Sequence, residues 1–121
     1  MSEFEIRKTM SFEAAHRLPG VPEGHKCGRL HGHSFKVTFV VRGSLDSKIG
    51  WVLDFGDVKK AVKPILDQLD HYYLNEIKGL ENPTSEVLSK WIFDQAELHV
   101  PGLYQIIVAE TCTTESRYPI R

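Results

Sequence analysis

The sequence lacks any apolar run that approaches the roughly 20 residues of a membrane-spanning helix. Its start, MSEFEIRKTM, carries too many charges for a signal peptide. The two cysteines, Cys27 and Cys112, lie far apart, which argues against a disulfide framework and against a cysteine zinc cage. No repeat, low-complexity stretch or linker divides the 121 residues. We therefore expect a soluble, cytoplasmic protein with a single domain over residues 1–121.

The chain also lacks an excess of charge of either sign. Lys and Arg number 15, Asp and Glu number 16, and the formal net charge is −1. Such a balance gives no positive field that would attract nucleic acid or an anionic membrane, so a small molecule is the expected partner. An anionic ligand has to be held by a local group of cations. A chain this small leaves little bulk for a deep cleft, so the position of a pocket is an open question.

Two stretches near the N-terminus alternate between apolar and polar side chains, a pattern typical of half-buried β-strands. The first begins at Phe4, and its inner face ends at His16. The second runs to Val41, and its inner face begins with His31 and His33. The segment between these strands is dense in glycine and proline, which predicts a loop.

The middle of the chain predicts two helices. Asp54 is a suitable N-cap for the first, whose apolar residues recur at helical spacing over 55–69 although Pro64 interrupts the pattern. The second helix opens near Thr84 and ends before the Pro-Gly pair at 101–102.

Further strands are expected beside these helices. Residues 43–50 predict a turn into a short strand at 51–53, residues 103–112 alternate again, and 116–120 suit a final edge strand. The main elements follow the order ββααββ. This order predicts an α+β domain with an antiparallel sheet and both helices on one face.

Three histidines have the spacing of a metal site. His31 and His33 lie two apart on a strand and project from one face, and His16 has the same inner phase on the preceding strand. If the strands pair, three imidazoles can bind one ion and leave a fourth position open, as in catalytic zinc sites. The alternative is that each histidine packs or hydrogen-bonds individually, but the shared spacing favours a metal.

Cys27 lies four residues before His31, in a loop with His25, Lys26 and Arg29. Neighbouring cations favour the thiolate form, so Cys27 is a candidate reactive group. The alternative is an inert buried cysteine, for which Cys112 on a strand is the better example.

Other polar residues allow two interpretations each. Asp70 and His71 can form an acid–base pair or a solvated helix end. Glu110 has the inward phase of a strand, so its carboxylate needs a partner, either a ligand with two parallel N–H donors or a structural arginine. Thr84 and Ser85 suit a helix cap, with ligand contact as the weaker alternative.

The strings FEAAHRL, CGRLHGH, LDHYYLN, NPTSE and ETCT contain these residues in order. They resemble the 6-pyruvoyltetrahydropterin synthase superfamily and, within it, the bacterial 6-carboxy-5,6,7,8-tetrahydropterin synthases of the queuosine pathway, over roughly residues 4–112. The resemblance implies the tunnelling fold, with a four-stranded antiparallel sheet and two helices per subunit. Three subunits close a barrel, and two trimers stack into a homohexamer with sites at the subunit interfaces.

The resemblance also implies a role for each candidate residue. Zinc (Zn²⁺) is held by the histidines at 16, 31 and 33. Catalytic roles fall to Cys27 as the thiolate base, to Asp70 with His71 as a relay, and to Glu110. Binding of the pterin falls to Glu110, Thr84 and Ser85, the last two from a neighbouring subunit.

The implied activity is a zinc-dependent carbon–carbon lyase without a nicotinamide cofactor. It converts 7,8-dihydroneopterin triphosphate and water to 6-carboxy-5,6,7,8-tetrahydropterin, acetaldehyde and triphosphate. The alternatives are a 6-pyruvoyltetrahydropterin synthase, which keeps the three-carbon side chain, and a non-catalytic zinc or pterin-binding module. His25, Lys26 and Arg29 are the nearest local cations for a triphosphate, although an exposed basic loop is the commoner reason for such residues.

Overall fold

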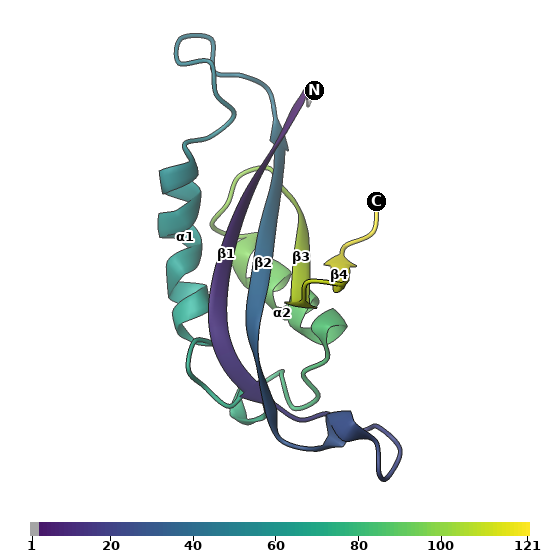
Figure 1. Cartoon of the computed structure of the whole chain (residues 1–121). Coiled ribbons are helices and arrows are strands. Elements are labelled where there is room, and N and C mark those ends of the chain that lie inside the picture. Colours follow the sequence, from purple (N-terminus) through teal and green to yellow (C-terminus); the bar gives the residue numbers. More distant parts are fainter. Residues whose placement is uncertain (1–2) are drawn as a thin grey trace.

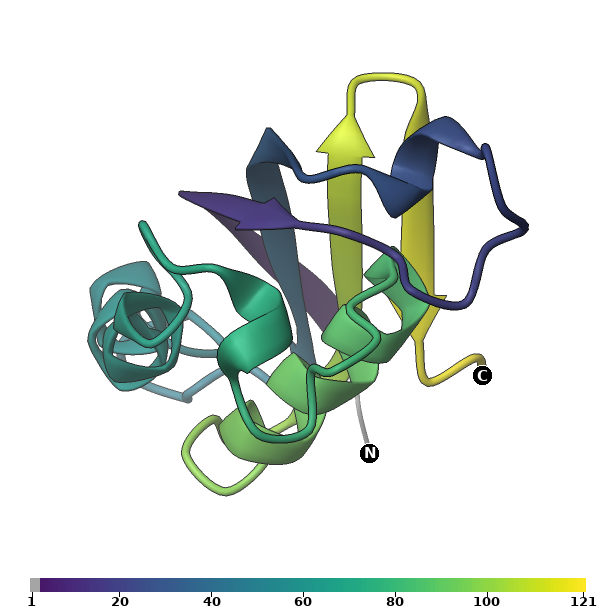
Figure 2. The ribbon, with the colours of Figure 1, turned by 90° about the horizontal axis from the view of Figure 1, so that it is seen from below.

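A computed structural model describes residues 3–121, which form one antiparallel sheet and two helices. The elements in chain order are β1 (Phe4–His16), β2 (His31–Gly43), α1 (Phe55–Asp67), α2 (Ser85–Ala96), β3 (Leu103–Thr111) and β4 (Thr114–Tyr118), with 3-10 turns at Lys26–Gly28 and Leu74–Glu76. The strands lie in the order β1-β2-β3-β4, and both helices cover the same face of the sheet (Figures 1 and 2). The predicted α+β class and the ββααββ order are confirmed.

The long hairpin of β1 and β2 fixes the positions of the site residues. These strands pair along their whole length, and His16 lies opposite His31 at the end of the register. Phe12 and Phe35 also lie opposite one another and stack with ring centroids 5.0 Å apart. Opposed residues project from the same face, so the histidines continue the apolar face that packs on the helices.

The helices bury one face each against this sheet. Asp54 caps α1 by accepting a hydrogen bond from the Gly56 amide at 2.8 Å, as predicted. Pro64 does not end the helix; it is exposed, as is Lys60, whose carbonyl has no helical donor because proline lacks an N–H. No helix within residues 3–121 is long and apolar enough to cross a membrane. The helices contribute to the core Val58, Val62, Ile65, Leu66, Leu88, Ile92 and Phe93.

The predicted strand at residues 51–53 is wrong. Asp46 closes the preceding segment into a compact loop, since its carboxylate accepts the amides of Lys48 and Ile49, both at 2.9 Å. The Asp46 amide also donates to the carbonyl of Trp51 at 2.8 Å. Backbone groups engaged inside a loop are not available to a strand partner.

The last hairpin turns earlier than the sequence predicts. β4 begins at Thr114 and not at Ser116, and the Thr111 hydroxyl lies 2.9 Å from that of Thr114 across the turn. Cys112 lies in this turn and is exposed, so the expectation of a buried cysteine on a strand is wrong.

The segment after α1 lies along the outer edge of β1. The His71 amide donates to the Glu13 carbonyl at 2.6 Å, and the Ala15 amide donates to the Tyr72 carbonyl at 3.2 Å. Ala15 and Tyr73 also form an isolated parallel bridge. His71 adopts a positive φ of 64° within this clamp. The end of α1 is therefore attached to β1 near the histidines.

Candidate metal centre and adjoining acid–base groups

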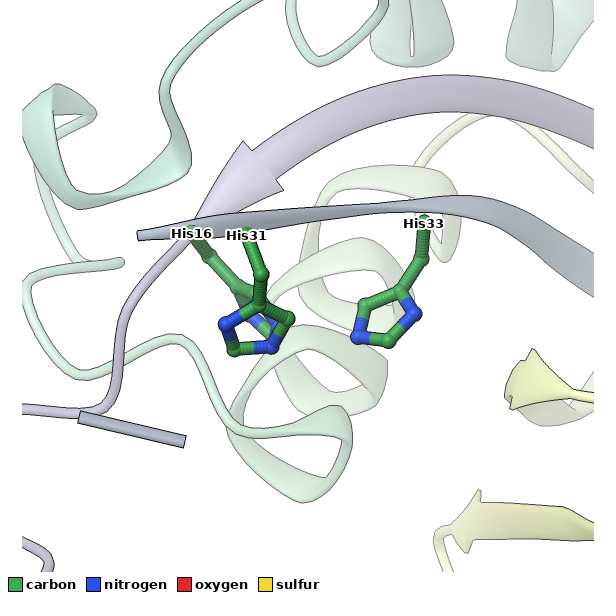
Figure 3. A group of neighbouring side chains, drawn as sticks. All are labelled: His16, His31 and His33. Atoms are coloured by element: carbon green, nitrogen blue, oxygen red, sulfur yellow. The ribbon is translucent and has the colours of Figure 1, made fainter. Parts of the chain in front are cut away.

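Three histidine rings converge at the end of β1 and the start of β2 (Figure 3). The ring centroids of His16 and His31 lie 4.6 Å apart, and that of His33 lies 4.9 Å from His31 and 5.2 Å from His16. One ring nitrogen of each residue lies within 4.8 Å of the other two, so the cluster can hold a metal ion. The pairing of β1 with β2 thus brings together the ligands that the sequence pattern predicts.

Backbone carbonyls orient two of the rings. His16 Nδ1 lies 2.8 Å from the Pro83 carbonyl oxygen, and His31 Nδ1 lies 2.7 Å from that of Arg29. A carbonyl only accepts, so Nδ1 donates in both rings and Nε2 keeps its lone pair. Such partners fix the tautomer of metal-binding histidines. The sequence does not reveal them, because a backbone carbonyl has no residue signature.

Two ring nitrogens of the cluster lack a hydrogen bond. His16 Nε2 and His33 Nε2 are buried and make none within residues 3–121. A buried polar atom left unpaired costs about 1–3 kcal/mol, and a metal ion would remove that cost by taking the lone pair. Burial lowers the pKa of His16, against the opposing effects of the Pro83 carbonyl and Glu110. The neutral form that burial favours is the one that binds metal, so these residues fit a metal ion.

Glu110 shares the face of the histidines. Its Oε2 lies 3.5 Å from His33 Nε2, beyond a good hydrogen bond. No arginine pairs with this carboxylate anywhere in residues 3–121, so a structural arginine does not account for it. About a quarter (24%) of the side chain is exposed. The carboxylate is therefore free to accept hydrogen bonds from a ligand beside the metal centre.

Cys27 lies in the 3-10 turn Lys26–Gly28 and is partly buried. Its amide donates to His25 Nδ1 at 3.0 Å, and its carbonyl accepts from the Leu18 amide at 2.8 Å. Leu18 is two residues beyond His16, so the loop folds back to the end of β1, where the histidine cluster lies. Cys27 is therefore not part of the hydrophobic core.

Asp70 and His71 form a pair in the structure. Asp70 Oδ2 lies 3.0 Å from His71 Nδ1, and Asp70 Oδ1 accepts the Glu13 amide at 2.9 Å. The Glu13 amide, and after it His71, hold the pKa of Asp70 below its ordinary value. The His71 side chain is 76% exposed, so its ring can reach a molecule outside the chain.

This pair lies beside the opposite face of the sheet from the metal cluster. His71 lines a hollow together with Glu13 and Ser34, whose side chains are joined by a hydrogen bond of 2.7 Å, and His33 of the cluster also contributes to its lining. Glu13 and Ser34 alternate with the residues that face the helices, so they project away from the histidine rings. Within residues 3–121, no hydrogen bond or ion pair links His71 to the cluster.

The start of α2 supports the metal centre. Thr84 Oγ1 accepts the Val87 amide at 3.1 Å, so the predicted cap is confirmed, and the Ser85 hydroxyl lies 3.0 Å from Glu86 Oε1. Both hydroxyls are therefore engaged within the helix terminus. The residue before Thr84 is Pro83, whose carbonyl orients His16.

Asn75 is a supporting residue that the sequence interpretation missed. Its Oδ1 accepts the Arg17 amide at 3.0 Å, and its Nδ2 donates to the Arg17 carbonyl at 2.8 Å. These bonds fix the backbone directly after His16. The only sequence signal for Asn75 is its place in the string LDHYYLN.

Comparison with known proteins gives a consistent result. Residues 5–119 match the family described as 6-pyruvoyl tetrahydropterin synthase. The chain is 49% identical over 119 residues to the 6-carboxy-5,6,7,8-tetrahydropterin synthase of Synechocystis sp., covering 93% of this chain and 91% of that protein. It is 39% identical over 92 residues to the dihydroneopterin monophosphate aldolase of Pyrococcus furiosus, covering 76% and 74%. The structure of Caenorhabditis elegans 6-pyruvoyl tetrahydropterin synthase superposes with a TM-score of 0.87 at 26% identity, covering 95% and 94%.

Proposed function

Because the chain belongs to the 6-pyruvoyl tetrahydropterin synthase family, we propose that it is a zinc-dependent lyase acting on 7,8-dihydroneopterin triphosphate. The substrate reacts with water to give 6-carboxy-5,6,7,8-tetrahydropterin, acetaldehyde and triphosphate, and the step belongs to queuosine biosynthesis in the cytoplasm. The name of the Synechocystis relative supports this reaction. The observation on this chain that carries the proposal is the histidine cluster, in which two buried ring nitrogens lack hydrogen bonds and Glu110 Oε2 lies 3.5 Å from His33 Nε2.

The histidines would hold zinc, which prefers neutral imidazole and keeps an open position in catalytic sites. The bound ion supplies Lewis-acid stabilisation of negative charge on the substrate side chain. The carbonyls of Pro83 and Arg29 keep the rings of His16 and His31 in the binding tautomer. This support favours a centre that stays in place while substrate binds and leaves.

Glu110 is proposed to bind the pterin ring. Its carboxylate accepts two parallel N–H bonds, from N3 and the 2-amino group, a pairing that is both charge-assisted and bidentate. Thr84 and Ser85 are proposed to contact the pterin from a neighbouring subunit, with their hydroxyls still bound within α2. The ring is thereby oriented with its side chain toward the metal centre.

Cys27 and His71 are proposed to move protons. The Cys27 thiolate takes a proton from the substrate side chain, and His71, oriented by Asp70, returns or removes protons as triphosphate leaves. The two groups belong to different faces of one chain, so the complete site requires His71 from a neighbouring subunit. We therefore propose a homohexamer, a dimer of trimers, of single-domain chains with sites at the interfaces.

Product analysis tests this function. Zinc-loaded protein is incubated with 7,8-dihydroneopterin triphosphate, and mass spectrometry is expected to detect acetaldehyde and the 6-carboxy product. Release of triphosphate with the three-carbon side chain retained would assign the protein as a 6-pyruvoyltetrahydropterin synthase. Absence of triphosphate release would leave a binding module. In the matched variant Cys27→Ala, turnover should be lost while zinc stays bound; turnover at the unchanged rate would exclude the role of Cys27.

A further inference from the structure

The arginines of the described chain fall into two groups. Arg17 and Arg29 make no side-chain hydrogen bond, ion pair or ring contact within residues 3–121. The others are held by a carboxylate, a carbonyl or the Tyr104 ring: Arg7, Arg42, Arg117 and Arg121. The two unengaged guanidinium groups therefore remain available to bind an external anion.

Both of these arginines line the same hollow. It has a volume of about 280 Å³, and it lies within the loop that joins β1 to β2. His25 and Glu23 also line it. His25 Nδ1 accepts the Cys27 amide, so the neutral ring carries its proton on Nε2 and has a donor to offer. The lining thus contains two guanidinium groups and one imidazole donor, against a single carboxylate, that of Glu23.

The hollow is attached to the metal centre at both ends of the loop. Arg17 directly follows His16, and Asn75 fixes the Arg17 backbone. The carbonyl of Arg29 accepts the His31 ring at 2.7 Å. Figure 2 shows the molecule from the end at which this loop joins the two strands. The two arginines that line the hollow are therefore tied through the backbone to two histidines of the cluster.

We propose that this hollow binds the triphosphate of the substrate through Arg17 and Arg29, with His25 as an additional donor. The assignment rests on the proposed function for the identity of the phosphate ester. A guanidinium group matches two phosphate oxygens at once. Local cations are required because the whole chain carries a net charge of −1. Lys26, which the sequence suggested, does not line the hollow, and Arg17 takes its place.

The test uses inorganic triphosphate as the probe and the full-length, zinc-loaded protein. We expect Arg17→Ala/Arg29→Ala to weaken triphosphate binding in calorimetry by about 10- to 100-fold. Lys59→Ala, which removes a cation from the exposed side of α1, is the matched control and should bind as the wild type does. Glu23→Gln should bind triphosphate more tightly, since it removes the opposing charge from the same loop. Unchanged binding by the double variant, or weaker binding by Glu23→Gln, would overturn the assignment.

Kinetics separate this proposal from the proposed function. With the pterin triphosphate, the double variant should raise KM by about tenfold or more, whereas inhibition by 7,8-dihydroneopterin, which has no phosphate, should not change. Normal KM in an active double variant would refute the hollow and leave the lyase intact. If the wild type binds inorganic triphosphate through these arginines but turns over no pterin, the lyase assignment fails and the phosphate site stands.

Discussion

Replacing Glu110 by glutamine removes one charge and preserves the size of the side chain. Glu110 lies on the helix-facing side of β3, with Oε2 3.5 Å from His33 Nε2 and 24% of the side chain exposed. Its carboxylate accepts from N3–H and from the 2-amino group of the pterin in the proposed complex. A glutamine amide has one acceptor oxygen, and its NH₂ group would face the second ring donor. In the variant, the glutamine NH₂ group and one pterin N–H group would therefore face each other, and two donors cannot form a hydrogen bond.

The size of the effect follows from this mismatch. A hydrogen bond to a charged group contributes about 1.5–3 kcal/mol, and the variant loses one such bond and weakens the other. We expect the binding free energy of the pterin to fall by about 2–4 kcal/mol, a rise of about 30- to 1000-fold in the dissociation constant. Zinc content should stay at the wild-type level, because the three histidines supply the ligands.

The measurement is calorimetric binding of 7,8-dihydroneopterin to zinc-loaded Glu110→Gln. This ligand has no phosphate, so it reports the ring contacts separately from the arginine hollow. A dissociation constant within about threefold of the wild type would refute the ring contact. Loss of zinc from the variant would show instead that Glu110 supports the metal centre through His33.

Three further predictions concern the metal, the cap of α2 and the free energy of unfolding at acidic pH. His31→Ala should reduce the zinc retained after dialysis from about one ion per chain to a small fraction, measured by inductively coupled plasma mass spectrometry. Full retention would contradict zinc binding by the histidine cluster. Thr84→Ala should lower the free energy of unfolding in urea by about 1 kcal/mol, whereas Thr84→Ser should not; equal stability of both would argue against the cap. The Glu13 amide and His71 lower the pKa of Asp70, so its stabilisation is present above the unfolded pKa and is lost as pH falls through the folded one. The free energy of unfolding, measured by urea titration at several pH values, should therefore fall less steeply below about pH 4 in Asp70→Asn than in the wild type. Parallel pH dependences of the two proteins would contradict this.

The sheet and the histidine cluster could be predicted because both depend on a single periodicity. Alternation with period two placed His16, His31 and His33 on the inner face of two strands. Antiparallel pairing then left one arrangement in which these residues meet, with His16 opposite His31. Local cap chemistry at Asp54 and Thr84 placed the helix starts for a similar reason, since each oxygen accepts an amide within three residues.

The missed features depend on contacts between distant segments or on backbone atoms. The carbonyl of Pro83 orients His16 across 67 positions of the chain, and no residue type marks such a contact. The strand expected at 51–53 had suitable side chains, but the carbonyl of Trp51 accepts the Asp46 amide within the preceding loop. The alternation of the sequence placed Cys112 on the inner face of a strand, but the strand ends at Thr111 and Cys112 lies in the turn that follows. In each case tertiary or turn geometry overrides the local pattern.

The division of the site between the two faces of the sheet gives a direct prediction about assembly. Cys27 belongs to the loop at the metal centre, whereas His71 is clamped to the edge of β1 beside the opposite face. In the proposed site, one chain supplies the histidine cluster and Cys27, and a second chain presents His71. Cys27→Ala and His71→Ala should each abolish turnover in separate homo-oligomers.

The most direct measurement is the activity of oligomers that contain both variants. If equal amounts are mixed by unfolding and refolding, about one quarter of the interface sites receive an intact Cys27 and an intact His71 from different chains. We predict recovery of about a quarter of the wild-type turnover, with native mass spectrometry used to verify mixing. Turnover no higher than that of the separate variants, in verified mixed oligomers, would contradict a site shared between subunits.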